Sequence, residues 1–404
     1  MFEQVEIPYG CYWSSPFVRW QGSLQHLHAI KFAAYVARRE LAKRDIDPKS
    51  FDAGVLGLSI YQQQSFYGTP WFMGLLGAAQ APGPTVSQVC ASGVRAVLMA
   101  AQEIGSGLAQ TVLAATADRC SNGPHTYYPS PAGPGGTGVA EDVVLDSFNC
   151  DPLGKHSMLQ TAENVAAKYS ISTAEQHDVV LQRFAQYQDA LADESAFQKR
   201  YMDLPFAIPE PRLRRISGEI DGDQGVTEST ADGLAKLKPV IDGGTVTFGD
   251  QTHPADGNAA IVIAQQEKAR ELSTDAKVQI RILSVGQSRA ELGYMPEAPA
   301  GAAQAALRQV DLSFDDMDAI KTHNPFAVND IVFARQTGVA LNDFNNFGCS
   351  LIWGHPQAPT AMRTIIELIE ELVMRGCGRG LFTGCAAGDS GMAMILAVDS
   401  RQPR

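Results

Sequence analysis

Apolar residues in the first part of the chain follow two spacings, one typical of buried strands and one typical of amphipathic helices. Short apolar runs predict strands at 54–60, 85–89 and 111–115, and helical spacing predicts helices at 26–43 and 92–105. An order of strand, helix and strand predicts a parallel sheet covered by helices.

The later part of the chain repeats this order. Apolar runs predict strands at 259–264, 278–285, 318–322, 380–383 and 392–398, and helices at 299–309 and 358–374. Between the two parts, 158–169 and 173–192 are predicted helices with polar faces, and the second begins at a capping box that opens at Ser172. We therefore predict an α/β protein of two similar halves with an inserted helical segment.

Proline and glycine are concentrated in one stretch, NGPHTYYPSPAGPGGTG at 122–138. This composition predicts a long surface loop and a domain boundary. The stretch 204–244 is predicted to be irregular and charged.

Composition narrows the class of protein. Of the 404 residues, 45% are hydrophobic and 19% are charged, which excludes disorder for the bulk of the chain. The formal net charge of −12 argues against a nucleic-acid partner, because an acidic surface repels phosphates. No apolar run is long enough to span a membrane, and the N-terminal MFEQVEIPYG resembles neither a secretory signal nor a transit peptide.

Cysteine usage points to a reducing compartment. The seven cysteines are odd in number and scattered, which favours free thiols in a cytoplasmic protein. No cysteine pair has C-x-x-C spacing and no Cys/His cluster has zinc-finger spacing, so we expect no metal site.

Cys90 is the clearest candidate for chemistry. It follows an apolar strand and precedes a helix, in T-V-S-Q-V-C-A-S-G-V-R-A. Unpaired N–H groups and the helix dipole at such a position favour the nucleophilic thiolate, and Arg95 lies on the same first turn. The alternative is a buried structural cysteine.

Two histidines are candidate bases for that thiol. His355 lies in W-G-H-P directly before the helix at 358–374, in a turn that glycine and proline make tight and rigid. His323 lies in K-T-H-N-P-F just past a strand end, where α/β folds place functional groups. Taken alone, either histidine is better explained as a hydrogen-bonded structural residue.

Cys385 opens a run of small residues, C-A-A-G-D-S-G, after the apolar strand L-F-T. The run predicts a second tight turn with free backbone N–H groups that can hold an oxyanion.

Several motifs together resemble the thiolase family, which forms or cleaves 3-oxoacyl-CoA thioesters. V-C-A-S-G-V-R-A, H-N-P-F-A, G-H-P and C-A-A-G-D-S-G occur in the family's order. Further similar segments are S-P-F-V-R-W-Q-G-S-L from Ser15, T-A-E-N-V-A-A-K-Y from Thr161, D-G-L-A-K-L-K-P-V from Asp232 and D-G-N-A-A from Asp256. The resemblance covers nearly the whole chain.

The resemblance implies a thiolase-like fold of two βαβαβαββ halves in α/β/α/β/α layers. It implies an N-terminal half at 1–120, completed by 246–270, an inserted loop domain at 121–245 and a C-terminal half at 271–404. It also implies an acyltransferase that uses coenzyme A as a substrate and holds no tightly bound cofactor. The reaction is reversible thiolysis of a 3-oxoacyl-CoA, or condensation of acyl-CoA units, through an acyl-cysteine.

The resemblance also implies a role for each site residue. Cys90 is the nucleophile, His355 its base and Cys385 the acid/base at the α-carbon. His323 stands where many thiolases have an asparagine that polarises the thioester oxygen, and a histidine there resembles the sterol-carrier-protein type. Backbone N–H groups of Cys90 and Ala387 form a second oxyanion hole.

Departures from the family pattern affect the substrate more than the reaction. The residues after G-H-P are Gln357, Ala358, Pro359, Thr360 and Ala361, in place of a Gly-Ala-Ser-Gly run. By the resemblance, Thr252 and Met158 occupy substrate-binding positions, although plain core packing is the better explanation for Met158 and Phe347. Trp353 also flanks the histidine turn, and a bulky or aromatic acyl chain in lipid or aromatic-acid metabolism fits these changes.

Family resemblance implies a homodimer or a dimer of dimers, with 66–76 (FYGTPWFMGLL) at the interface unless it is an ordinary core helix. Two alternatives to an independent thiolase stay open. One is a ketoacyl-synthase-like condensing enzyme, which would lack the second cysteine. The other is a thiolase-like subunit that needs a small accessory partner.

Overall fold

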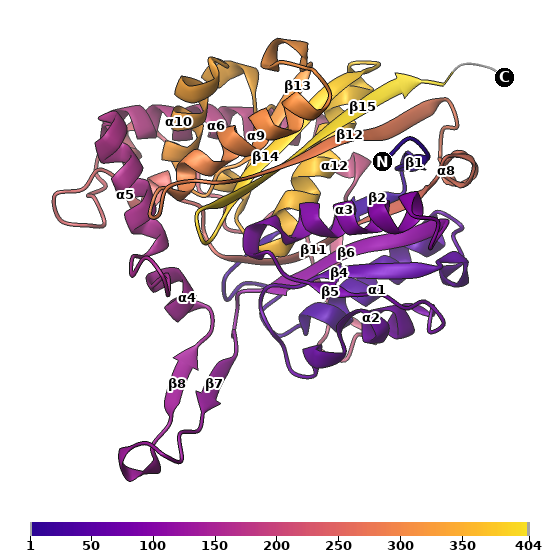
Figure 1. The fold of residues 1–404 in the computed structure, drawn as a ribbon, viewed down its shortest axis with the longest axis horizontal. Helices are drawn as coiled ribbons and strands as arrows, with labels where there is room; N and C mark the ends of the chain where they lie inside the picture. Colours follow the sequence, from indigo (N-terminus) through magenta and orange to yellow (C-terminus); the bar gives the residue numbers. More distant parts are fainter. Residues whose placement is uncertain (1, 402–404) are drawn as a thin grey trace.

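Residues 2–401 are described by a computed structural model, and a long mixed sheet runs through it (Figure 1). Its strands follow the order β13, β14, β15, β12, β1, β11, β6, β4, β5, and two short strands, β2 and β3, also pair with β11. The bounds are β1 Val5–Glu6, β2 Tyr12–Ser14, β3 Val18–Arg19, β4 Ala53–Gly57, β5 Thr85–Val86, β6 Thr111–Arg119, β11 Ala255–Gln265, β12 Val278–Arg289, β13 Ala319–His323, β14 Gly378–Ala386 and β15 Ser390–Ser400.

The sheet consists of two halves with the same pattern of strand directions. In the first half, β4 is parallel to β6, and β6, β11 and β1 then alternate in direction. In the second half, β13 is parallel to β14, and β14, β15 and β12 alternate likewise. The halves meet at the two-residue strand β1, which pairs with both β11 and β12. The predicted α/β fold of two similar halves is confirmed.

Helices complete five layers. The outer layers are α1 and α2 against the first half and α9 and α10 on the second, and α3 and α12 lie between the halves (Figure 1). Their bounds are α1 Ala29–Lys43, α2 Gly68–Leu76, α3 Ser92–Gly105, α9 Ala298–Gln309, α10 Ala327–Thr337 and α12 Ala358–Met374.

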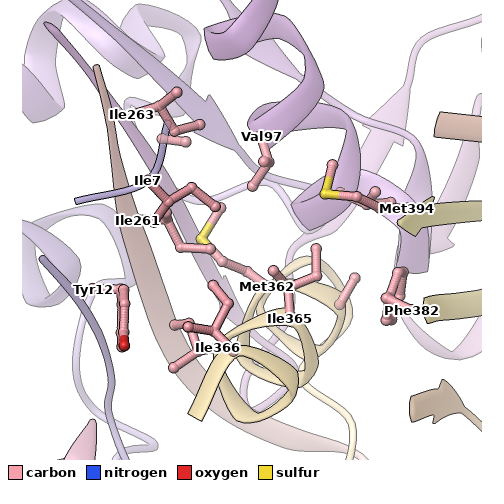
Figure 2. Close-up of a cluster of buried hydrophobic side chains, with 14 of the residues drawn as sticks. Ile7, Tyr12, Val97, Ile261, Ile263, Met362, Ile365, Ile366, Phe382 and Met394 are labelled. Carbon is pink, nitrogen blue, oxygen red and sulfur yellow. The ribbon is translucent and has the colours of Figure 1, made fainter. Parts of the chain in front are cut away.

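Burial of α12 shows where the core lies. Every residue from 358 to 372 is buried, which requires packing on all sides of the helix. Met362, Ile365 and Ile366 of α12 face Val97 of α3 and Ile261 of β11 (Figure 2). The apolar residues at helical spacing therefore hold the two halves together.

Gly93 sets the distance between the two central helices. A Cβ atom at this position would lie 2.6 Å from the carbonyl oxygen of Ala358 and 2.7 Å from the backbone nitrogen of Met362. Only glycine permits this approach. The N-terminal ends of α3 and α12 are therefore adjacent, and the residues before each helix share one site.

The segment between β6 and β11 contains more regular structure than predicted. The expected loop at 122–138 is wrong in part, because β7 (His125–Tyr128) pairs with β8 (Val139–Asp142) in a hairpin that extends away from the body (Figure 1). His-Thr-Tyr-Tyr has the β-branched and aromatic character of a strand, which the neighbouring prolines obscured. The rest of this segment comprises α4 Leu145–Asn149, α5 Met158–Tyr169, α6 Thr173–Ser195, β9 Phe206–Pro209, β10 Ile216–Ile220 and α7 Ala231–Leu234.

Two further helices are α8 (Gln266–Leu272) and α11 (Ser350–Trp353). No helix within residues 2–401 is both long and apolar enough to cross a bilayer.

Candidate active site

Cys90 lies in a strained turn before α3. The predicted strand at 85–89 ends at Val86, and residues 89–91 form a 3-10 turn instead. Val89 has φ +50°, a left-handed conformation that is costly for a β-branched side chain. Ser92 holds the turn, since its Oγ accepts from the backbone N–H of Gln88 and donates to the carbonyl of Val89.

His355 contacts the sulfur of Cys90 from the turn before α12. Its Nε2 lies 3.2 Å from Cys90 Sγ, and its Nδ1 lies 2.6 Å from Thr360 Oγ1 on the first turn of α12. Gly354 before it has φ +97°, and proline follows it. This geometry satisfies the distance requirement for a thiol and its general base.

His323 ends β13 and faces the same point. Its ring centroid lies 4.2 Å from that of His355, and its Nδ1 lies 2.8 Å from Ser350 Oγ. Its Nε2 is buried with no hydrogen-bond partner among the described residues. An unpaired buried ring nitrogen beside the nucleophile is available to a substrate atom.

Neighbouring hydrogen bonds bear on the tautomer of His323. The Ser350 hydroxyl can donate either to His323 Nδ1 or to Asn324 Oδ1, 3.1 Å away. Asn324 Oδ1 already accepts from the backbone N–H of Leu351. Donation from Ser350 to Nδ1 places the ring proton on Nε2, whereas donation from Ser350 to Asn324 places it on Nδ1.

Cys385 lies near the end of β14, close to Cys90. Its Sγ accepts a hydrogen bond of 3.4 Å from Asn329 Nδ2, and Asn329 Oδ1 accepts from the backbone N–H of Phe326. Burial, followed by the neighbouring Cys90, raises the pKa of the Cys385 thiol. Cys385 is therefore a neutral thiol with a proton to give.

Burial dominates the ionisation of Cys90. It raises the pKa of the thiol to about 12, although backbone N–H groups of Ala387 and of Cys90 itself oppose the shift. The expected stabilisation of the thiolate at the helix start is present but outweighed. Arg95 does not assist, because its guanidinium binds Gln88 and Gln287. The resting pair is a neutral thiol beside a neutral imidazole, since burial also lowers the pKa of His355.

A cavity of about 340 Å³ opens onto the sulfur. Cys90, His355, Ala387, Met158 and Thr252 are among the residues that line it. Thr252 donates through its hydroxyl to the carbonyl of Ser350. The other large side chains, Phe148, Leu159, Phe248, Met295 and Phe326, make the cavity mostly apolar. Of the residues that the sequence marked, Cys90, His355, Ala387, Met158 and Thr252 line this cavity, while His323 contacts His355 and Cys385 lies near Cys90.

Two flanking aromatic residues belong to the core instead. Phe347 stacks on Phe197 with ring centroids 4.1 Å apart. Trp353 is fully buried between Phe17 and Arg363. Neither shapes the cavity.

Sequence reasoning missed three polar residues in contact with the site residues. Asn329 binds Cys385, Ser350 binds His323, and Gln357 places its Oε1 3.2 Å from Cys90 Sγ. A signal existed for Gln357, since it is a polar residue directly after the candidate base in a tight turn. Nothing local marks Asn329 or Ser350, because each acts through a partner distant in sequence.

The donor atoms of Cys90, His323 and His355 lie within 4.8 Å of one another, and sulfur and imidazole nitrogen are ligands that Zn²⁺ accepts. The same spacing serves a nucleophile and its base, which is how we interpret it.

Comparison with known proteins identifies the class of enzyme. Residues 13–267 match the thiolase N-terminal domain and residues 276–398 match the thiolase C-terminal domain. The acetyl-CoA acetyltransferase of Chromobacterium violaceum is 31% identical over 391 residues, which are 94% of this chain and 95% of that protein. The acetyl-CoA acetyltransferase of Escherichia coli is 30% identical over 384 residues, 93% and 94% of the two chains.

Two solved structures of enzymes of this class have a similar fold. The Bacillus anthracis acetyl-CoA acetyltransferase has a TM-score of 0.88 at 27% identity and covers 98% of both chains. Human mitochondrial 3-ketoacyl-CoA thiolase has a TM-score of 0.88 at 25% identity, covering 98% of this chain and 99% of its own. The chain belongs to the thiolase family and is a thiolase-type acyltransferase.

Proposed function

We propose that Cys90 is the nucleophile that carries the acyl group as a thioester. The observation that carries this proposal is the 3.2 Å contact between Cys90 Sγ and His355 Nε2 in the lining of the cavity. His355 takes the thiol proton as the sulfur attacks the 3-oxo carbon of the substrate. Proton removal during attack suits a thiol whose pKa burial has raised to about 12, because no resting thiolate is then required.

Cleavage of the bond between C2 and C3 releases the enolate of acetyl-CoA. The Cys385 thiol gives its proton to C2, and the resulting thiolate later deprotonates the incoming CoA thiol. That thiol attacks the acyl carbon, and His355 returns its proton to Cys90. Condensation is the same sequence in reverse.

Two donor sets stabilise the charges that form in these steps. The backbone N–H groups of Cys90 and Ala387 hold the oxyanion at the acyl carbon. His323 donates from Nε2 to the enolate oxygen, directly or through a water. One such donor contributes about 3–4 kcal/mol to the transition state, so we expect His323 to matter nearly as much as the thiols.

The substrate we propose is a 3-oxoacyl-CoA with an apolar acyl chain, with CoA as the second substrate and no resident cofactor. The side chains of Met158, Phe148 and Leu159 support an apolar chain, and Thr252 offers a polar contact at the wall. An aromatic or lipid-derived acyl group suits such a lining.

Mass spectrometry tests the nucleophile. Wild-type protein incubated with an acyl-CoA should gain one acyl group on the peptide that contains Cys90, and Cys90→Ala should gain none there. Acylation of Cys90→Ala at another active-site residue would refute the assignment. A panel of linear, branched and aromatic 3-oxoacyl-CoA esters then tests the acyl preference.

We also propose that the enzyme is a homodimer, alone or as a dimer of dimers. Tyr61, Phe66 and Tyr67 are 62%, 94% and 67% exposed beside β5, the edge strand of the first half. An exposed edge strand with aromatic neighbours is suited to pairing with a second copy. Phe66→Ser should shift the sedimentation coefficient towards the monomer, and Tyr127→Ser on the distant hairpin is the matched control.

The division into 1–120 with 246–270, 121–245 and 271–404 stays a proposal, as does a cytoplasmic location, which the free cysteines support. Turnover by purified protein alone would show that no accessory subunit is needed. The comparisons favour an independent thiolase over a ketoacyl-synthase-like enzyme, and Cys385 beside Cys90 agrees with them.

A further inference from the structure

Gln357 contacts the nucleophile but has no part in the reaction as described so far. It lies between His355 and the first turn of α12, and its side chain is buried. Its backbone has φ +65°, the left-handed region that costs any residue other than glycine. An amide side chain is therefore held against the sulfur at a position where the backbone itself favours glycine.

The amide oxygen and the imidazole compete for one proton. Cys90 Sγ has two acceptors at 3.2 Å, His355 Nε2 and Gln357 Oε1, while a thiol carries a single hydrogen. In the resting enzyme the thiol can donate to either one. Once the sulfur has attacked the carbonyl carbon, it has no hydrogen and is a weak acceptor, and the transferred proton is on His355 Nε2. Gln357 Oε1 is then the acceptor beside that new N–H.

The protonated His355 has little other support. Its Nδ1 faces the neutral hydroxyl of Thr360 rather than a carboxylate. Burial and the adjacent His323 both lower the pKa of His355, and a hydrogen bond with Gln357 raises it.

The other titratable groups around this centre are Cys90 before α3, Cys385 of β14, and Asp118 and Cys120 at the end of β6. The Asp118 carboxylate is engaged elsewhere, by N–H groups of Ser59, Ile60 and Ala358.

We propose that Gln357 is a catalytic residue that accepts the Cys90 S–H in the resting enzyme and the Nε2–H of protonated His355 in the tetrahedral adduct that forms when Cys90 attacks the substrate. The S–H proton moves to Nε2 as the sulfur–carbon bond forms, and Gln357 Oε1 accepts that N–H in the adduct. When CoA removes the acyl group through a second tetrahedral adduct, Gln357 accepts the same N–H until the proton returns to Cys90. The inference rests on the roles of Cys90 and His355 given under the proposed function.

Gln357→Met is the variant that tests this. Methionine has a similar length and the same backbone cost at φ +65°, but no amide oxygen. Iodoacetamide alkylation of Cys90, followed by peptide mass spectrometry across pH, reports how easily the thiol loses its proton. We expect alkylation at neutral pH to slow about tenfold, because the hydrogen bond from protonated His355 to the amide oxygen is lost. With acetoacetyl-CoA and CoA, kcat should fall similarly while KM changes little.

Gln309→Met, an exposed amide at the end of α9, is the matched control and should behave as wild type. An unchanged alkylation profile and kcat with a raised KM would overturn the proposal and make Gln357 a substrate contact. Failure of the proposed function looks different, because Cys90 would then escape acylation in the wild type as well.

A measurement on the wild type keeps the proposal testable if Gln357→Met does not fold. In ¹⁵N-histidine NMR of the tetrahedral adduct that Cys90 forms with an acyl trifluoromethyl ketone, His355 should have both ring nitrogens protonated at neutral pH. A neutral His355 ring in that adduct would overturn the proposal.

Discussion

The imidazole rings of His323 and His355 lie face to face, with centroids 4.2 Å apart and planes inclined by 32°. They come from different elements, the end of β13 and the turn before α12. Two positive charges at this distance in a buried site repel strongly. Burial lowers the pKa of His323 to about 3, and burial together with the charge of His323 lowers that of His355. Both rings are therefore neutral in the resting enzyme, as an acceptor at His355 requires.

Neutral buried histidines predict acid sensitivity. Below pH 6.5 the unfolded chain binds protons at these histidines and the folded chain does not, so their contribution to stability is present above pH 6.5 and is lost as the pH falls towards 3. At pH 5 the loss is about 2 kcal/mol per histidine. Urea unfolding at pH 7 and at pH 5 measures this decrease in the free energy of unfolding.

A matched comparison isolates His323. Burial raises the pKa of Asp118 to about 7 and of Asp256 to about 6, and these carboxyls act in the opposite direction because they bind protons in the folded state. His323→Asn should therefore lose less stability than wild type between pH 7 and pH 5. An identical difference in the two proteins would show that His323 is not buried in its neutral form.

Cys385→Ala should separate acylation from carbon–carbon chemistry. Cys90 keeps its contact with His355, so acyl transfer from an acyl-CoA to Cys90 should persist within a few-fold. Condensation and thiolysis should fall by at least about a hundredfold, the range of a lost general acid. Stopped-flow assays of both half-reactions measure this, with the exposed Cys150→Ala as control. Normal condensation by Cys385→Ala would contradict the acid/base role.

Ser350→Ala should impair His323 without touching substrate. The hydroxyl that favours the Nε2–H tautomer is lost, and Nδ1 can then carry the proton instead. We expect kcat to fall about tenfold, roughly the net contribution of one hydrogen bond, with KM little changed. Ser350→Thr keeps the hydroxyl and should recover activity. If both variants lose activity equally, packing rather than the hydroxyl is what matters.

Local sequence patterns predicted the halves of this fold because each half is built from short, strongly apolar strands and helices. They also predicted α12, where an apolar stretch fills every side of the helix. The β7–β8 hairpin was missed, because its strands carry exposed residues and depend on pairing rather than on burial. The end of the strand before Cys90 was misplaced, since Val89 adopts a left-handed conformation that its side chain disfavours.

The site was predictable to the extent that its residues sit at element ends. Cys90 and His355 precede helices, His323 and Cys385 lie at or near the ends of strands, and the family resemblance assigned their roles. Asn329 and Ser350 were not predictable, because a polar side chain at a helix start has many uses and only the packing of α10 and α11 against the strand ends selects one. The protonation states of the two thiols and the two imidazoles were not predictable either, since the extent of their burial depends on the whole fold.

The inserted segment is tied to the active-site helix by one buried ion pair, which predicts a large effect on stability. Asp223 accepts hydrogen bonds of 2.6 and 2.8 Å from Arg363 of α12, and neither side chain is exposed. The guanidinium also packs on Trp353, two residues before His355. Asp223→Ala removes one of the two buried carboxylates that pair with Arg363, leaving Glu367 at 3.0 Å, and it also removes the acceptor for the backbone N–H of Phe17. We expect the free energy of unfolding to fall by about 3–5 kcal/mol.

Asp399→Ala is the matched control for this ion pair, because Asp399 pairs with Arg281 at 2.6 Å on the surface, with both side chains more than two-fifths exposed. A pair of this kind contributes about 0–1 kcal/mol. Urea unfolding of both variants gives the comparison, and Cys90 alkylation in the folded Asp223→Ala protein reports on the histidine turn. Equal stabilities would mean that Glu367 or water compensates for the lost carboxylate at Arg363.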